Sequence, residues 1–95
     1  MILHSADGFS YAQPDETTIR TAFDALFAHT DPAANVWLAD DQDRWLTIYQ
    51  DGRAILHDQE PKEVFHIEKS DPEMALALFK QMKAGDFSAV RSAFV

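Results

Sequence analysis

"VWLADDQDRWLTIYQDGRAIL", residues Val36–Leu56, is the stretch that decides the fold. Aromatic and β-branched residues, which favour strands, fill its apolar runs, and aspartate-rich segments separate these runs. The Asp51-Gly52 pair favours a tight hairpin turn, because both residues accept the positive φ that a type I′ turn requires. The pattern continues to Lys69, so the sequence predicts four antiparallel strands over residues 35–40, 44–50, 53–58 and 63–69.

A helical pattern precedes the predicted sheet. After Pro14, apolar residues recur at the spacing of one face of an amphipathic helix, namely at Ile19, Ala22, Phe23, Leu26 and Phe27. Asp15 and Glu16 lie at the N-terminal end of this helix, where negative charge is favourable. Pro32 disfavours the helical conformation at the residue before it, so the helix ends there. Residues 1–13 are weakly patterned and fit either a short edge strand or a loop.

Two more helices are predicted after the strands. Ser70 and Glu73 have the spacing of a capping box with the serine as N-cap, and the apolar face of that helix is Ala75, Leu78, Phe79 and Met82. Gly85 is a typical helix stop, and Asp86 can cap a last short helix that buries Phe87, Val90 and Phe94. We therefore expect one α+β domain over residues 1–95, with an N-terminal helix, a four-stranded antiparallel meander and two C-terminal helices.

The turn at Asp51-Gly52 also predicts the register of the central hairpin. With two turn residues, Tyr49 opposes Ala54 and Ile48 opposes Ile55. One face of the hairpin then carries Leu46, Ile48 and Ile55, and the other carries Trp45, Thr47, Tyr49, Ala54 and Leu56. Both faces are substantially apolar, which a sheet with one solvated face does not require.

The side on which Trp37 lies depends on the turn through "DDQD". An even-length turn places Trp37 beside Leu46, whereas a bulge places it on the Trp45 face. In either arrangement the aromatic face needs a cover, because monomers seldom expose large apolar patches. Three helices, a second copy of the chain or a partner protein would supply that cover.

Composition limits the class of protein. With 46% hydrophobic and 25% charged residues among 95, the chain is typical of one folded globular domain. It has no cysteine, which excludes disulfides and thiolate zinc sites. The first residues lack the pattern of a signal peptide and the longest apolar run is too short to span a membrane, so we expect a cytoplasmic protein.

Charge separates the classes of partner. Sixteen acidic and eight basic residues give a net charge of −8, which repels nucleic-acid phosphates and anionic membranes. We expect neither as a ligand. The acidity either serves solubility or steers the chain towards a basic protein.

Motifs for catalysis are absent from the sequence. It contains no P-loop, dinucleotide fingerprint, H-E-x-x-H or G-x-S-x-G, so we expect no enzyme, no catalytic residue and no cofactor. "DDQDRW" lacks the glycine and the distal glutamate of a calcium loop and fits a surface turn. His57 and His66 fall on neighbouring predicted strands but have no defined third ligand, so we predict no metal site.

Two segments resemble a known class of protein. "DRWLTIYQDGRAI" at residues 43–55, followed by "MALALFKQMKAGDFSAVRSAF" at residues 74–94, is similar in layout to small acidic immunity proteins of bacterial toxin–immunity systems. The resemblance covers residues 34–94. It implies a cytoplasmic binding protein that blocks the active site of a cognate toxin with an acidic, aromatic-rich surface, and it assigns no role to individual residues.

The predicted partner-binding surface combines aromatic and acidic residues, because aromatic side chains anchor interfaces and charges guide encounter. It consists of Trp37, Asp40, Asp41, Asp43, Trp45, Tyr49 and Asp51. Core packing is the alternative for each aromatic residue, and a solvated turn is the alternative for each aspartate. The alternative function is a homodimeric adaptor or secretion chaperone that self-associates through the apolar sheet face.

Overall fold

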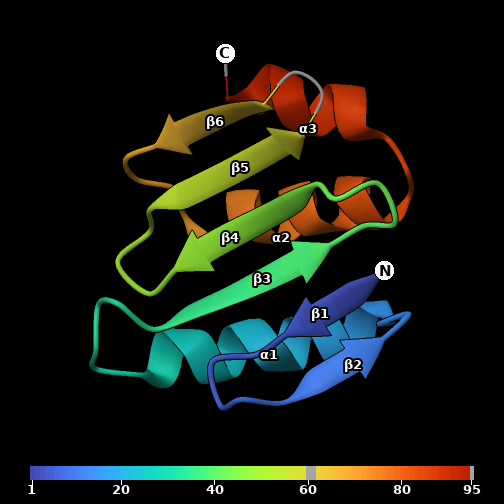
Figure 1. Cartoon of the computed structure of the whole chain (residues 1–95). Helices are drawn as coiled ribbons and strands as arrows, with labels where there is room; N and C mark the ends of the chain where they lie inside the picture. Colours follow the sequence, from blue (N-terminus) through green and yellow to red (C-terminus); the bar gives the residue numbers. More distant parts are fainter. Residues whose placement is uncertain (60–61, 95) are drawn as a thin grey trace.

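The computed structural model describes residues 1–59 and 62–94, which form an α+β fold of three helices and one six-stranded antiparallel sheet. The elements in chain order are β1 (Ile2–His4), β2 (Ser10–Ala12), α1 (Glu16–Ala28), β3 (Asn35–Ala39), β4 (Trp45–Tyr49), β5 (Ala54–Gln59), β6 (Lys62–Ile67), α2 (Pro72–Lys83) and α3 (Phe87–Ala93). The strand order is β2-β1-β3-β4-β5-β6. All three helices lie on one face of the sheet (Figure 1).

The four predicted strands and three predicted helices are present, but the predicted four-stranded sheet is incomplete, because residues 1–13 take the strand alternative and the first helix follows two strands. Residues 2–12 form a short hairpin that adds two strands to the sheet. Strand β1 pairs with β2 on one side and with β3 on the other. Leu3 opposes Leu38 of β3 and is fully buried. The turn predicted between the last two strands includes residues 60 and 61, which lie outside the described residues.

Aspartates begin all three helices. Asp15 accepts a hydrogen bond from the Thr18 amide at 2.7 Å, and Asp71 accepts one from the Met74 amide at the same distance. Asp86 caps α3 through the Ala89 amide, as the sequence predicted. Each carboxylate satisfies an amide that the first helical turn leaves without a partner.

The prediction that Ser70 is the N-cap of α2 is wrong, because Asp71 holds that position. Ser70 instead contacts the β4–β5 turn: its amide donates to the Gly52 carbonyl at 2.7 Å and its hydroxyl donates to the same oxygen at 2.9 Å. Ser70 is buried, and these bonds fix the start of α2 against the central hairpin.

The predicted register of that hairpin is wrong by one residue. The loop has three residues, 50–52, because the Gly52 amide donates to the Tyr49 carbonyl and the Tyr49 amide donates to the Arg53 carbonyl. Gly52 takes a φ of +95° in the position that follows the turn, which is a common three-residue hairpin. Ile48 therefore opposes Ala54.

The corrected register separates two faces that the predicted register mixed. Aliphatic residues of the central hairpin point towards the helices, namely Leu46, Ile48, Ala54 and Leu56, all fully buried. They join a core made with the helices by Ile19, Leu26, Ala75, Phe79 and Val90. Ile55, which the predicted register placed with Leu46, lies on the opposite face.

The β3–β4 loop is also a three-residue hairpin loop that ends in a residue with positive φ. The Asp40 amide donates to the Arg44 carbonyl at 2.9 Å, and Asp43 takes a φ of +56° where the other loop has glycine. The loop thus has an odd number of residues, so Trp37 opposes Thr47 and shares the face of Trp45. Of the two alternatives left open by the sequence, the bulged one is observed.

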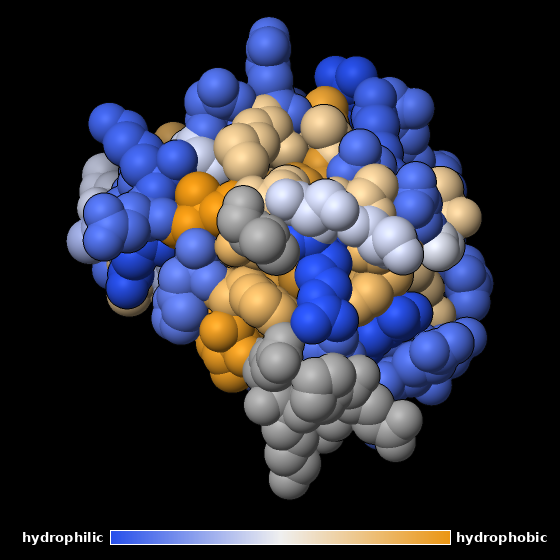
Figure 2. Space-filling model, turned by 90° about the horizontal axis from the view of Figure 1, so that it is seen from above, coloured by the Kyte–Doolittle hydropathy of each residue, from blue (hydrophilic) through white to orange (hydrophobic). Residues whose placement is uncertain are grey.

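Helix α3 packs at the β6 end of the molecule, where cationic side chains cover aromatic rings. The guanidinium of Arg91 lies 5.1 Å from the centre of the Phe65 ring, and that of Arg44 lies 3.9 Å from the Phe87 ring. Figure 2 views the molecule from this end and shows apolar residues gathered at its centre with polar residues around them.

Candidate functional site: the open face of the sheet

The side of the sheet opposite the helices carries no covering element among residues 1–59 and 62–94 (Figure 1). We call it the open face. Side chains alternate across a strand, so the residues between the core positions lie there. They are Ile2, His4, Ser10, Ala12, Asn35, Trp37, Ala39, Trp45, Thr47, Tyr49, Ile55, His57, Val64 and His66.

Two rows of directly opposed residues cross this face. The first row is His4, Trp37, Thr47, Ile55 and His66. The second row is Ile2, Ala39, Trp45, His57 and Val64. Ile2 and Val64, towards the two ends of the second row, are apolar and 44% and 51% exposed, so apolar surface lies on both sides of the Trp45 and His57 pair.

Each tryptophan of the open face stacks on a histidine of a neighbouring strand. The ring centres of His4 and Trp37 lie 3.7 Å apart with planes 13° from parallel, and those of Trp45 and His57 lie 4.4 Å apart at 21°. The hydroxyl of Ser10 lies 2.9 Å from Nδ1 of His4 and fixes the first pair from its outer side. Both indoles are half-buried and held by these stacking contacts, so little side-chain freedom remains to be lost on binding.

Tyr49 belongs to the same face and is also held in place. The guanidinium of Arg53 lies 4.4 Å from the centre of its ring. Arg53 in turn donates through Nε to Oδ2 of Asp51 at 2.8 Å. The backbone amide of Arg53, followed by its charged side chain, lowers the pKa of Asp51. Asp51 is thus bound into its own turn.

The predicted acidic residues divide into two groups. Asp40, Asp41 and Asp43 lie at the β3–β4 loop, whereas Asp51 lies at the opposite end of the strands (Figure 1). The Asp40 carboxylate accepts from the Gln42 and Arg44 amides and from Arg44 Nε at 2.7 Å, and only 11% of its side chain is exposed. Asp40 is therefore a structural residue of its turn.

Asp41 and Asp43 are the predicted acids that remain outward. The Asp41 side chain is 90% exposed, and its carboxylate lies 3.1 Å from the N-terminal ammonium of Met1. Asp43 is exposed at the tip of the same loop. These two carboxylates give one rim of the open face its exposed negative charge.

His57 is the open-face residue with the least favourable environment for charge. Burial lowers its pKa, and the nearby charge of His66 lowers it further. Its Nδ1 atom is buried and has no hydrogen-bond partner in the described part of the chain. No cluster of three or more histidine, cysteine, aspartate or glutamate side chains suited to a metal ion occurs among the described residues.

Sequence reasoning missed the part of the open face that β1 supplies. Ile2 and His4 extend the aromatic and apolar rows beyond β3. A short strand of three residues produces no clear periodic signal, and its pairing with β3 joins residues far apart in the chain. The stacking of His4 on Trp37 was therefore not foreseeable from local pattern.

Comparisons with family models, curated proteins and solved structures find no match for this chain. None of the helices formed by the described residues is long and apolar enough to cross a membrane.

Proposed function

We propose that this protein is a protein-binding inhibitor of the bacterial cytoplasm, which seats a basic protein partner on the open face and neutralises it as an immunity protein neutralises its cognate toxin. The observation that carries the proposal is an uncovered sheet face on which Trp37, Trp45 and Tyr49 lie together. Large apolar patches left exposed on small domains usually mark interaction sites. The resemblance of residues 34–94 to immunity proteins supports the same class.

The arrangement suits a tight interface. Tryptophan and tyrosine are enriched among residues that dominate binding energy, and three of them are held by stacking or cation–π contacts on one surface. Because these contacts fix the rings before binding, association loses little conformational entropy. Asp41 and Asp43 lie beside this surface at the rim and add long-range attraction for a basic protein.

Net charge favours a basic partner over a second copy of the chain. Two copies that each carry −8 repel each other, and bringing two open faces together adds their acidic rims to that repulsion. The homodimeric adaptor remains the second candidate function, because Ile2 and Val64 extend an exposed apolar row across the open face. Mass measured by light scattering over a range of concentrations separates a dimer from a monomer.

The test begins with a search for a basic, toxin-like protein that co-purifies with this chain. The two proteins should form a one-to-one complex, and its formation should abolish the partner's toxicity. Trp45→Ala should weaken the complex by about 2 kcal/mol, roughly thirtyfold in Kd, mainly through faster dissociation. Phe27→Ala is the matched control, because Phe27 is a half-buried aromatic residue on the helix side. A folded Trp45→Ala variant that binds with unchanged Kd would overturn the proposal.

The acidic rim has its own control. Changing Asp41 and Asp43 together to Asn should slow association and reduce its dependence on salt. Changing Asp24 to Asn and Glu73 to Gln removes the same charge from exposed positions on the helix side. If both double variants alter the association rate equally, the net charge acts alone and the rim has no steering role.

A further inference from the structure

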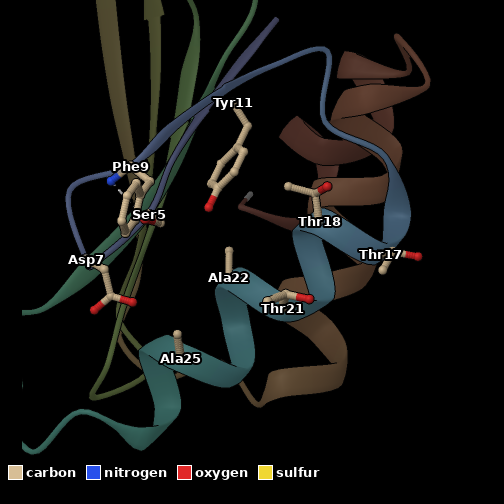
Figure 3. A pocket seen from close by; sticks show the side chains of 9 residues that line it. All are labelled: Ser5, Asp7, Phe9, Tyr11, Thr17, Thr18, Thr21, Ala22 and Ala25. Carbon is tan, nitrogen blue, oxygen red and sulfur yellow. Dashed lines mark hydrogen bonds between the residues drawn. The ribbon is translucent and has the colours of Figure 1, made fainter.

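A second unassigned surface lies on the helix side of the sheet, between the β1–β2 hairpin and α1. It is an open groove of about 260 Å³, and Figure 3 shows the side chains that line it. The hairpin contributes Asp7, Phe9 and Tyr11, and α1 contributes Thr21, Ala22 and Ala25. The groove shares no residue with the aromatic rows of the open face, so it requires a separate explanation.

Two aromatic rings form the hairpin side of the groove, and both are unusually exposed. Phe9 is 61% exposed and Tyr11 is 40% exposed, although Tyr11 opposes the buried Leu3 and points to the helix side. In Figure 3 the Tyr11 hydroxyl points into the space between hairpin and helix, and the small side chains of Ala22 and Ala25 keep that space open. Solvated rings of this size leave apolar area for a ligand to cover.

The electrostatics of the groove select a cation. Among its described lining residues, Asp7 supplies a carboxylate and none is lysine or arginine. Oδ1 of Asp7 lies 3.1 Å from Nε2 of His29, whose ring carries positive charge only when it is protonated. Aromatic faces carry negative potential and attract cations, and a neighbouring carboxylate adds to this attraction.

We infer that this groove binds an arginine side chain of a protein partner. A guanidinium is flat, weakly hydrated and able to stack on an aromatic ring while it donates to a carboxylate, which matches Phe9, Tyr11 and Asp7. The hydroxyl of Tyr11, which points into the same space, offers a further acceptor for its N–H groups. A lysine ammonium would pair with Asp7 but would use the planar rings less well.

The site is tested with Nα-acetyl-arginine amide, followed by NMR of the backbone amides at constant ionic strength. Saturable shifts are expected at residues 7–11 and 21–25. The citrulline analogue has the same shape without the charge and should bind about tenfold more weakly or not at all. Equal shifts with both probes would overturn the inference, as would shifts spread over the whole acidic surface.

Variants make the test specific to the groove. Asp7→Asn and Phe9→Leu should each weaken arginine binding by about threefold or more, because each removes one of the two attractions. Asp24→Asn removes the same charge from an exposed position of α1 outside the groove and should leave binding unchanged. If Asp24→Asn weakens binding as much as Asp7→Asn, the attraction is to net charge and the site does not exist. The probe needs no partner protein, so its failure and the failure of the open-face proposal are separate results.

Discussion

Gly52→Ala should destabilise the protein far more than the same change at Gly85. Both glycines have a positive φ, +95° and +82°, which costs an alanine about 1 kcal/mol. They differ in their surroundings. A Cβ at Gly52 would lie 2.8 Å from the backbone oxygen of Ser70, whereas a Cβ at Gly85 would meet no atom within 4 Å.

The size of the loss in stability expected for Gly52→Ala follows from two hydrogen bonds to the Gly52 carbonyl. The Gly52 carbonyl accepts from the Ser70 amide at 2.7 Å and from the Ser70 hydroxyl at 2.9 Å. Moving the two segments apart to admit a methyl group weakens both bonds, each worth about 1 kcal/mol. Gly52→Ala should therefore cost about 3 kcal/mol and Gly85→Ala about 1 kcal/mol.

Thermal and urea unfolding followed by circular dichroism measure this difference. A gap of about 2 kcal/mol corresponds to roughly 8–16 °C in Tm for a domain of this size. Gly8→Ala is a second control, because Gly8 has a φ of +86° and also has open space around it. Equal losses at all three glycines would refute the reasoning, because they would mean that the approach of Ser70 to the β4–β5 turn is not rigid.

The other stability predictions concern single positions of the sheet. Asp43→Gly should raise the free energy of unfolding by about 0.5 kcal/mol, because Asp43 has a φ of +56°, and an unchanged urea midpoint would show that no strain is stored there. Because the pKa of His57 is lowered in the folded state, unfolding takes up a proton and stability should fall below about pH 6.5. His57→Phe should lose less stability than the wild type between about pH 7.5 and pH 5.5, and parallel losses would contradict this. Leu46→Ala should lower the free energy of unfolding by about 2–5 kcal/mol, because Leu46 is fully buried. The Trp45→Ala variant at the adjacent position should stay folded. If it is unfolded, Trp45 is a core residue.

Local pattern predicted the elements of this fold but not how some of them pair. Periodicity in residues 35–69 and 15–28 is strong because each strand or helix buries one side, and the bounds agree to within a few residues. The Asp51-Gly52 pair, by contrast, fits both a two-residue turn and the last two positions of a three-residue loop. In the observed loop the Gly52 carbonyl accepts a hydrogen bond from Ser70, a contact between residues distant in sequence that local pattern does not reveal.

For the candidate site, too, local pattern predicted which residues contribute but not how each one is held. Trp37, Trp45 and Tyr49 were predicted to contribute to one surface, and the register places them on one face of the sheet. Asp40 and Asp51 look equivalent to Asp41 in the sequence, but each is held in its turn by an arginine. Whether an aspartate in a loop is outward or bound into the loop depends on the loop geometry, which composition does not specify.

The most direct measurement of the open-face proposal uses the two tryptophans of the chain, Trp37 and Trp45, since both lie on that face. Labelling with 5-fluorotryptophan gives one ¹⁹F resonance for each. Addition of the unlabelled toxin-like partner should shift both resonances, with saturation at one equivalent. A one-to-one complex that forms by calorimetry while both resonances stay unchanged would contradict the proposal, because the partner would then be bound elsewhere.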